Sequence, residues 1–285
     1  MIQYFICFGE VLWDMLPSGK VAGGAPMNVA FRLKELQNDV RLFTAIGKDE
    51  LGTELLEILK GMQLSKDVHS SEYLPTGTVA VELSEAGNAS YSIAEGVAWD
   101  EIPVKEMATQ SFQLIFGSLA LRSEKNQATI LKLIDLATEV VFDINLRAPF
   151  YSWELIDQFI QKAHLIKMNE DEFDWICDQM HIQEKNAKSR LSHIDQCYPH
   201  KIWCITKGAN GAAYFEHGIF YEQTGFPTKV VDTIGAGDAF LAGLLHRRQQ
   251  KASPQDFLRF ACKIGSIVAG QKGASQAFDP GQIVY

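Results

Sequence analysis

Residues 230–245 read Val-Val-Asp-Thr-Ile-Gly-Ala-Gly-Asp-Ala-Phe-Leu-Ala-Gly-Leu-Leu: a β-branched run, a glycine turn and the start of a helix. The first N–H groups of a helix lack partners within the helix and favour anions, phosphate above all. Glycines at 235 and 237 let the backbone approach an anion closely and adopt positive φ. Asp238 then stands where a carboxylate can take up a proton while charge develops nearby. A carboxylate there also stabilises the helix dipole without any catalytic role, so the segment alone leaves both interpretations open.

The whole segment resembles the C-terminal signature of the PfkB-type, ribokinase-like sugar kinases, and every signature position fits. Members of that family transfer the γ-phosphoryl group of ATP to a sugar hydroxyl. The resemblance implies that Asp238 is the catalytic base. It also implies that the backbone of Gly235, Ala236 and Gly237 forms the anion hole for the transferred group.

Length and composition predict one large domain, or one domain plus a small appendage. The chain has 285 residues, of which 47% are hydrophobic, enough for a buried core. Its net charge of −9 argues against nucleic acid or an anionic membrane as a partner. The cysteines are scattered without a Cys-x-x-Cys pair, so we expect reduced thiols and a cytoplasmic protein. The apolar first residues lack a basic segment and predict a buried strand rather than a signal peptide.

Short apolar runs alternate with helical patterns along most of the chain, which predicts an α/β fold with a doubly wound, mostly parallel sheet flanked by helices. We expect strands at Phe5–Gly9, Val40–Ala45, Leu114–Gly117, Val140–Asp143, Leu165–Met168, Trp203–Thr206 and Ala212–Phe215. We expect helices near Pro26–Leu36, Leu51–Met62, Lys125–Thr138, Trp153–Ala163, Glu170–Met180 and Phe257–Val268.

Two stretches, residues 11–21 and 71–99, break this rhythm and read as extended segments. Residues alternate in polarity over 78–83, and a Gly-Asn turn at 87 and 88 leads into a second strand-like run, as in a β-hairpin. We therefore expect a small β-sheet standing off a core of residues 1–10, 22–70 and 100–285. In the PfkB family such a sheet forms a lid over the sugar.

A glycine pair precedes the first expected helix. Gly23 and Gly24 would allow close approach of a ligand, although a loop-to-helix joint explains them equally well. The segment resembles the N-terminal family signature, which implies that Gly23, Gly24 and Asn28 contact sugar hydroxyls. Asp14 follows the first expected strand, and a carboxylate can accept two hydroxyl hydrogen bonds at once. An exposed aspartate is ordinary at a strand end, but the family has a sugar-binding aspartate here.

Polar residues alternate at the end of another buried strand. If the strand continues that far, Asp143, Asn145 and Arg147 share one side. Ligands of open α/β sheets gather at this carboxyl edge. The motif resembles the Asp-x-Asn-x-Arg of fructokinase-like family members, with Pro149 following as it often does there. We therefore expect Arg147 to bind substrate as a contact for phosphate.

Asn169 and Glu172 have the spacing of a helix capping box, which requires no function. In the family an Asn-x-x-Glu motif at this place organises Mg²⁺ and its waters. The resemblance therefore implies that Asn169 and Glu172 hold Mg²⁺ through water, and capping and metal duties need not exclude each other.

The turn at residues 206–211 joins two expected strands, and its Asn-Gly pair predicts a hairpin that needs no ligand. The family uses this turn beside the nucleotide phosphates, which implies ATP contacts at Thr206, Gly208 and Gly211. A looser resemblance over residues 270–275 implies that Gly273 lies beside the adenine.

The resemblance extends from Gly9 to about Ser275 with its motifs in family order. It implies an ATP-dependent kinase that phosphorylates a primary hydroxyl of fructose, with Mg²⁺ accompanying ATP. A ribokinase, another sugar kinase or a nucleoside kinase would keep nearly all these motifs, whereas a non-catalytic sugar-binding regulator would have no need of Asp238. The family often binds K⁺ near the anion hole, and the sequence leaves open both a K⁺ requirement and a homodimer.

Overall fold

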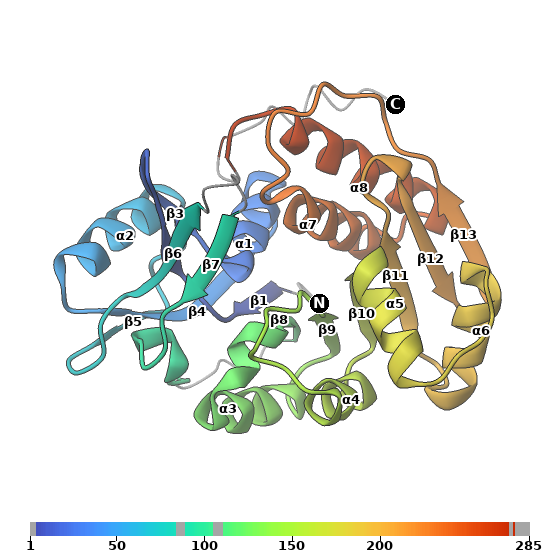
Figure 1. Ribbon diagram of the computed structural model, residues 1–285, viewed down its shortest axis with the longest axis horizontal. Helices are drawn as coiled ribbons and strands as arrows, with labels where there is room; N and C mark the ends of the chain where they lie inside the picture. The colour runs from blue at the N-terminus through green and yellow to red at the C-terminus, as the bar shows by residue number, and fades with distance from the viewer. Residues whose placement is uncertain (1–3, 84–88, 105–110, 274–275, 277–285) are drawn as a thin grey trace.

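The apolar runs form one large sheet in the computed structural model, which describes residues 4–83, 89–104, 111–273 and 276 (Figure 1). The strand order is β13-β12-β11-β10-β9-β8-β1-β4-β5. The strands are β1 (Tyr4–Phe8), β4 (Val40–Gly47), β5 (Val68–Ser71), β8 (Phe112–Gly117), β9 (Glu139–Asp143), β10 (Leu165–Asn169), β11 (Ile202–Thr206), β12 (Ala212–Glu216) and β13 (Ile219–Gln223). All neighbours from β5 to β11 pair in parallel, while β12 and β13 add an antiparallel edge.

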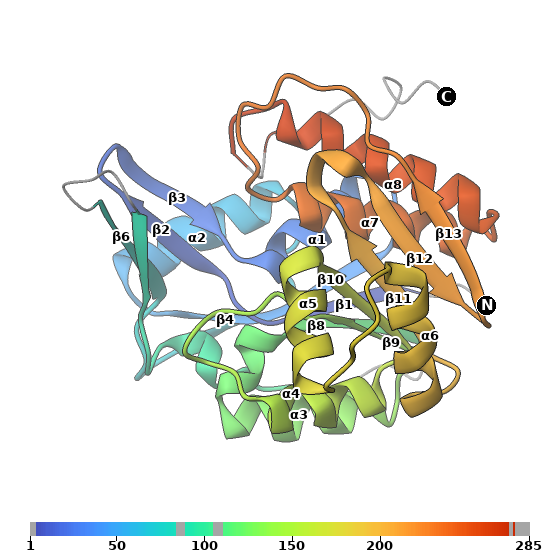
Figure 2. The same ribbon diagram turned by 45° about the vertical axis from the view of Figure 1, so that its right-hand side comes forward.

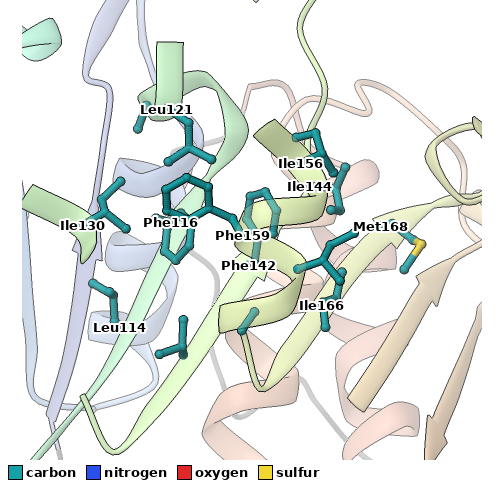
Figure 3. Packing of buried hydrophobic residues seen from close by; sticks show 14 of the residues in the cluster. Leu114, Phe116, Leu121, Ile130, Phe142, Ile144, Ile156, Phe159, Ile166 and Met168 are labelled. Atoms are coloured by element: carbon teal, nitrogen blue, oxygen red, sulfur yellow. The ribbon is translucent and has the colours of Figure 1, made fainter. Parts of the chain in front are cut away.

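Helices cover both faces of this sheet (Figure 2), so the doubly wound α/β fold is confirmed. Side chains alternate between the faces: Ile6 belongs to one core and Cys7 to the other. The first core includes α3 (Glu124–Ile134), α4 (Trp153–Lys162), α5 (Glu170–Gln179) and α6 (Ala187–Cys197). The second includes α1 (Ala25–Glu35), α2 (Glu50–Gly61), α7 (Ala236–Gln249) and α8 (Pro254–Ala269). Figure 3 shows the first core, where the rings of Phe116 and Phe142 stack 5.0 Å apart.

A second sheet of four strands has the order β3-β2-β6-β7. Its strands are β2 (Leu12–Leu16), β3 (Gly19–Gly23), β6 (Gly77–Leu83) and β7 (Ala89–Ile93). The antiparallel pairing of β6 with β7 confirms the expected hairpin, whose Gly87-Asn88 turn lies outside the described residues. The smaller sheet expected beside the main one is therefore present.

One carboxylate ties this second sheet to the main body. Asp49 accepts hydrogen bonds from the N–H of Gly52 (2.7 Å), capping α2, and from the N–H (2.8 Å) and hydroxyl (2.6 Å) of Thr76. Thr76 immediately precedes β6, and its hydroxyl also accepts the N–H of Gly47 at the end of β4 (3.0 Å). The start of β6 is thus fixed to two elements of the main body.

Every strand and helix expected from the sequence is present, with shifted ends. The helix expected over Lys125–Thr138 ends at Ile134. Three elements were missed, namely β5, β13 and α6. Short 3₁₀ segments lie at Ala98–Asp100, Ser118–Arg122 and Gly208–Asn210. Among the helices of the described residues, none has both the length and the apolar character needed to cross a membrane.

Candidate active site

The candidate site lies where the winding of the large sheet reverses. From β1 the chain winds outward to β4 and β5, then returns to β8 on the other side of β1 and continues to β11. Ligands of open α/β sheets bind at such a switch point, outside the carboxyl ends of the strands. Glu10 follows β1 there, Asp143 ends β9, and Asn169 ends β10. The start of α7 is held close to this edge, since Asp238 is hydrogen-bonded to Asn28 of α1.

The glycine turn before α7 has the backbone conformation that an anion site requires. Gly235 is the N-cap of α7 and has a left-handed φ of 77°. The N–H of Ala236 donates to the carbonyl of Thr233 at 3.2 Å, so it closes the turn. Among the described residues, the N–H groups of Gly237 and Asp238 have no hydrogen-bond partner. These two N–H groups are therefore the ones that the helix start offers to an anion.

Asp238 is half-buried in the first turn of α7 and is fixed by one side chain. Its Oδ2 accepts a hydrogen bond from Nδ2 of Asn28 at 2.8 Å, and Asn28 is itself buried on α1. Burial raises the pKa of Asp238 to about 6, although the positive charge of Lys167 acts in the opposite direction. At pH 7 this carboxylate is mostly ionised, and it has the basicity of a group that can accept a proton from an alcohol.

Lys167, which the sequence analysis missed, lies at the centre of the charged groups. It is buried in the middle of β10, and its Nζ donates to both oxygens of Asp143, at 2.9 and 3.1 Å. Burial alone would lower the pKa of Lys167, but the carboxylates of Asp143, Glu172 and Asp238 raise it above its usual value. The available signal was a lysine inside the apolar run Leu-Ile-Lys-Met.

On the side of the second sheet, Asp14 lies on β2 against the glycine pair. A Cβ atom added at Gly23 would lie 2.6 Å from Oδ2 of Asp14. Gly24 has a φ of 122°, and a Cβ there would lie 2.3 Å from the carbonyl oxygen of Glu10. Both glycines thus have a packing reason, which leaves the expected sugar contacts as a prediction. Burial raises the pKa of Asp14.

The expectation that Asp143, Asn145 and Arg147 share one side of a continuing strand is wrong. β9 ends at Asp143, and Asn145 has a left-handed φ of 38°, which turns the chain. Asp143 therefore points into the protein while Arg147 is exposed. The Arg147 charge still lowers the pKa of Asp14 and of Asp238, so it acts on the site from the solvent side.

Asn169 and Glu172 form the expected capping box at the start of α5. Oε2 of Glu172 accepts the N–H of Asn169 at 2.8 Å, and Oε1 accepts the N–H of Leu146 at 2.9 Å. A carboxylate oxygen has a second lone pair, so Glu172 can still accept a hydrogen bond from water. The donor set fits an outer-shell role for hydrated Mg²⁺. The described residues include no group of three or more His, Cys, Asp or Glu side chains suited to hold a metal directly.

The segments expected to contact ATP follow β11 and α8. Thr206 ends β11, and Gly208 begins a 3₁₀ turn with a φ of 52°. Gly211 is required by packing, since a Cβ there would lie 1.9 Å from the carbonyl oxygen of Gln223. The N–H of Gly273 donates to Oδ2 of Asp232 at 3.0 Å, which links the loop after α8 to the segment before α7. Residues 274 and 275 of this motif lie outside the described residues.

Residues 10–280 match the family model described as pfkB family carbohydrate kinase. The chain belongs to this family. The relatives that it resembles include the probable chloroplastic fructokinase-6 of Arabidopsis thaliana, at 27% identity over 99% of this chain and 81% of that protein. A fructokinase of Solanum tuberosum is 28% identical over 95% of this chain and 91% of that protein.

Solved structures of similar proteins confirm the pfkB-kinase fold. The fructokinase of Xylella fastidiosa with bound ATP has a TM-score of 0.86 at 21% identity, covering 96% of this chain and 94% of that one. The Vibrio cholerae fructokinase bound to fructose, ADP and calcium has a TM-score of 0.82 at 22% identity, covering 97% and 96%. The Salmonella enterica aminoimidazole riboside kinase, complexed with aminoimidazole riboside and an ATP analogue, has a TM-score of 0.82 at 19% identity and 98% coverage of both chains.

Proposed function

We propose that this pfkB-family kinase transfers the γ-phosphoryl group of ATP to a hydroxyl of fructose, with Asp238 as general base. The observation that carries the proposal is the arrangement at the start of α7. A carboxylate whose pKa is raised to about 6 is hydrogen-bonded to Asn28 and adjoins the free N–H groups of the glycine turn. A base and an anion site side by side are the two parts that phosphoryl transfer to an alcohol needs.

Each bond that forms in the proposed transfer is matched by one that breaks. The proton of the sugar hydroxyl passes to Asp238 while the hydroxyl oxygen forms a bond to the γ-phosphorus. The bond between that phosphorus and the bridging oxygen breaks, and its electron pair leaves with ADP. The N–H groups of Gly237 and Asp238, with the turn at Gly235 and Ala236, stabilise the charge on the phosphoryl oxygens. Positioning and electrostatics supply most of the catalysis in such a transfer.

In this proposal the sugar lies between the second sheet and the main body. Asp14, Gly23, Gly24 and Asn28 bind its hydroxyls, and the second sheet closes over it as a lid. Support comes from the position of Asp14 on β2, half-buried and pressed against Gly23. Closure would exclude water and limit wasteful hydrolysis of ATP.

The nucleotide would contact Thr206, Gly208, Gly211 and Gly273, with Arg147 on its phosphates. When bound with ATP, Mg²⁺ neutralises charge on the phosphate oxygens. Asn169 and Glu172 would hold that ion through its waters, since their own oxygens already accept backbone N–H groups.

Fructose is the sugar best supported among the alternatives. The Asp-x-Asn-Leu-Arg-x-Pro form of residues 143–149 is the fructokinase-like one, and the similar proteins named above are mostly fructokinases. The Salmonella protein of the same fold takes a riboside, so the fold itself admits other substrates. Buried polar groups that pair with particular hydroxyls reject analogues lacking them.

An ADP-release assay across fructose, ribose, glucose, adenosine and aminoimidazole riboside tests the proposal. We expect the highest kcat/KM for fructose and no ADP release above background without a sugar. A clear preference for ribose or a riboside would overturn the choice of fructose and leave the kinase activity standing. Absence of turnover with every compound would favour a sugar-binding regulator instead.

A further inference from the structure

A lysine occupies a position in β10 where the strand pattern predicts an apolar side chain. Ile166 and Met168, its neighbours, are fully buried in one core. The Lys167 side chain points to the opposite face, which α1, α7 and α8 cover, and only 8% of it is exposed. Asp143 is its direct partner across the parallel pair β9–β10, so both side chains lie on that face. The ion pair is thus buried beneath the start of α7.

The ammonium group lies beside the backbone of Gly237 in the first turn of α7. A Cβ atom added at Gly237 would be 3.4 Å from Nζ of Lys167, an ordinary van der Waals contact. Asp143 accepts two hydrogen bonds from the ammonium, which has three N–H donors. Among the described residues no other acceptor binds Nζ. A positive charge therefore adjoins the helix start whose N–H groups are free.

The stability of the folded protein does not explain why a lysine occupies position 167. A buried ion pair contributes little more than apolar residues of similar volume, because removing both ions from water offsets their attraction. The surroundings of Lys167 are also rich in negative charge, since Asp143, Glu172 and Asp238 all act on it. Of the charged groups that act most on Asp238, Lys167 and the exposed Arg147 are positive and Asp143 is negative, so Lys167 supplies the buried positive charge of this region.

We propose that Lys167 is a positioning residue: its ammonium, held by Asp143, supplies fixed positive charge beneath the N–H groups of Gly237 and Asp238 while the phosphoryl group is transferred. This rests on the function proposed above. Because the charge is preorganised and shielded from water, it acts more strongly in the transition state than the same charge would in solution.

The test separates this role from a structural one by removing both charges of the pair. Lys167→Met alone would leave the Asp143 carboxylate buried without its partner and can fail to fold. The double variant Lys167→Met/Asp143→Asn removes both charges, so we expect it to fold. We expect kcat to fall by about 100-fold, the effect of losing one donor of an oxyanion hole, while KM for the sugar changes little.

A second pair provides the matched control. Arg41, at the start of β4 and so at the end of this strand opposite the site, forms a partly buried ion pair with Asp67 (2.6 Å), so Arg41→Met/Asp67→Asn removes a second pair without touching the lid. This control should keep the wild-type kcat, since both charges of its pair are removed together. A Lys167→Met/Asp143→Asn enzyme that folds and keeps wild-type kcat would overturn the proposal, because the lysine would then be structural.

Binding of a transition-state mimic gives a readout that needs no turnover. We expect the double variant to bind ADP as the wild type does, but to lose about 100-fold in affinity for ADP with aluminium fluoride, which imitates the transferring phosphoryl group. Equal affinity of both proteins for the mimic would contradict the proposal. The sugar panel with the wild type reports on the proposed function separately, so failure of either one can be recognised.

Discussion

The hydrogen bond from Asn28 to Asp238 should set the pH at which the enzyme becomes active. Asn28 donates to an oxygen of the ionised carboxylate and so favours the ionised form, lowering the pKa of Asp238. Asn28→Ala removes this donor. The pKa of Asp238 should then rise above about 6, and activity should begin at a higher pH.

The size of the shift follows from the strength of the bond. A hydrogen bond to a charged group contributes about 1.5–3 kcal/mol, and one pKa unit corresponds to about 1.4 kcal/mol. Because Asp238 is only half-buried, water replaces part of the lost bond, and we take the lower end, about one unit. A base of pKa about 7 instead of about 6 is about fivefold less ionised at pH 6 and almost equally ionised at pH 8.

The assay is kcat at saturating fructose and ATP between pH 5 and pH 9, with ADP release as the signal. Saturation removes the effect of any sugar contact that Asn28 also makes. Asn126→Ala is the matched control, since Asn126 is also buried but bonds the backbone of Trp99 and Ile102 and no carboxylate. The reasoning is refuted if kcat of Asn28→Ala falls at the same low pH as kcat of the wild type and of the control.

Four further outcomes follow from the same geometry. Asp238→Asn should lower kcat by about 10²–10⁴-fold with fructose and ATP binding retained; near-normal turnover would remove Asp238 as the base. Asp14→Ala should raise KM for fructose strongly while KM for ATP stays unchanged, as measured by varying each substrate in turn. Gly24→Ala should lower the free energy of unfolding in urea by about 2 kcal/mol or more. The φ of Gly24 is 122°, and the added Cβ would lie 2.3 Å from the carbonyl oxygen of Glu10. Gly61→Ala is the control, because nothing lies within 4 Å of a Cβ added there. Hydrogen exchange in residues 11–21 and 71–83 should slow when fructose binds, and equal exchange with and without fructose would argue against a closing lid.

The fold could be predicted wherever strands are buried on both faces. Such strands are short continuous apolar runs, and the helices between them have clear periodicity. The missed elements lack these signals. β13 lies at the sheet edge with Ile219 more than half exposed, and α6 buries only Leu191 and Ile194. Edge strands and weakly amphipathic helices form because of contacts with neighbouring elements, and a local sequence pattern carries no information about those contacts.

The candidate site was predictable only where backbone geometry defines it. The turn at Gly235 needs a left-handed residue and the helix that follows needs a cap, so local sequence carries both. The pairing of Lys167 with Asp143 instead depends on the register between two strands. The expected alignment of Arg147 with Asp143 failed for a related reason, because one left-handed residue, Asn145, reverses the alternation.

The bond between Asn28 and Asp238 joins residues 210 positions apart in the chain. During synthesis, β1, α1 and β4 leave the ribosome long before α7, so this hydrogen bond can form only when most of the chain has been made. Closing so long a loop is also among the slower steps of folding. Recovery of catalysis after dilution from denaturant should therefore lag behind recovery of helical circular dichroism. The rate at which turnover returns would then report the docking of α7 onto α1.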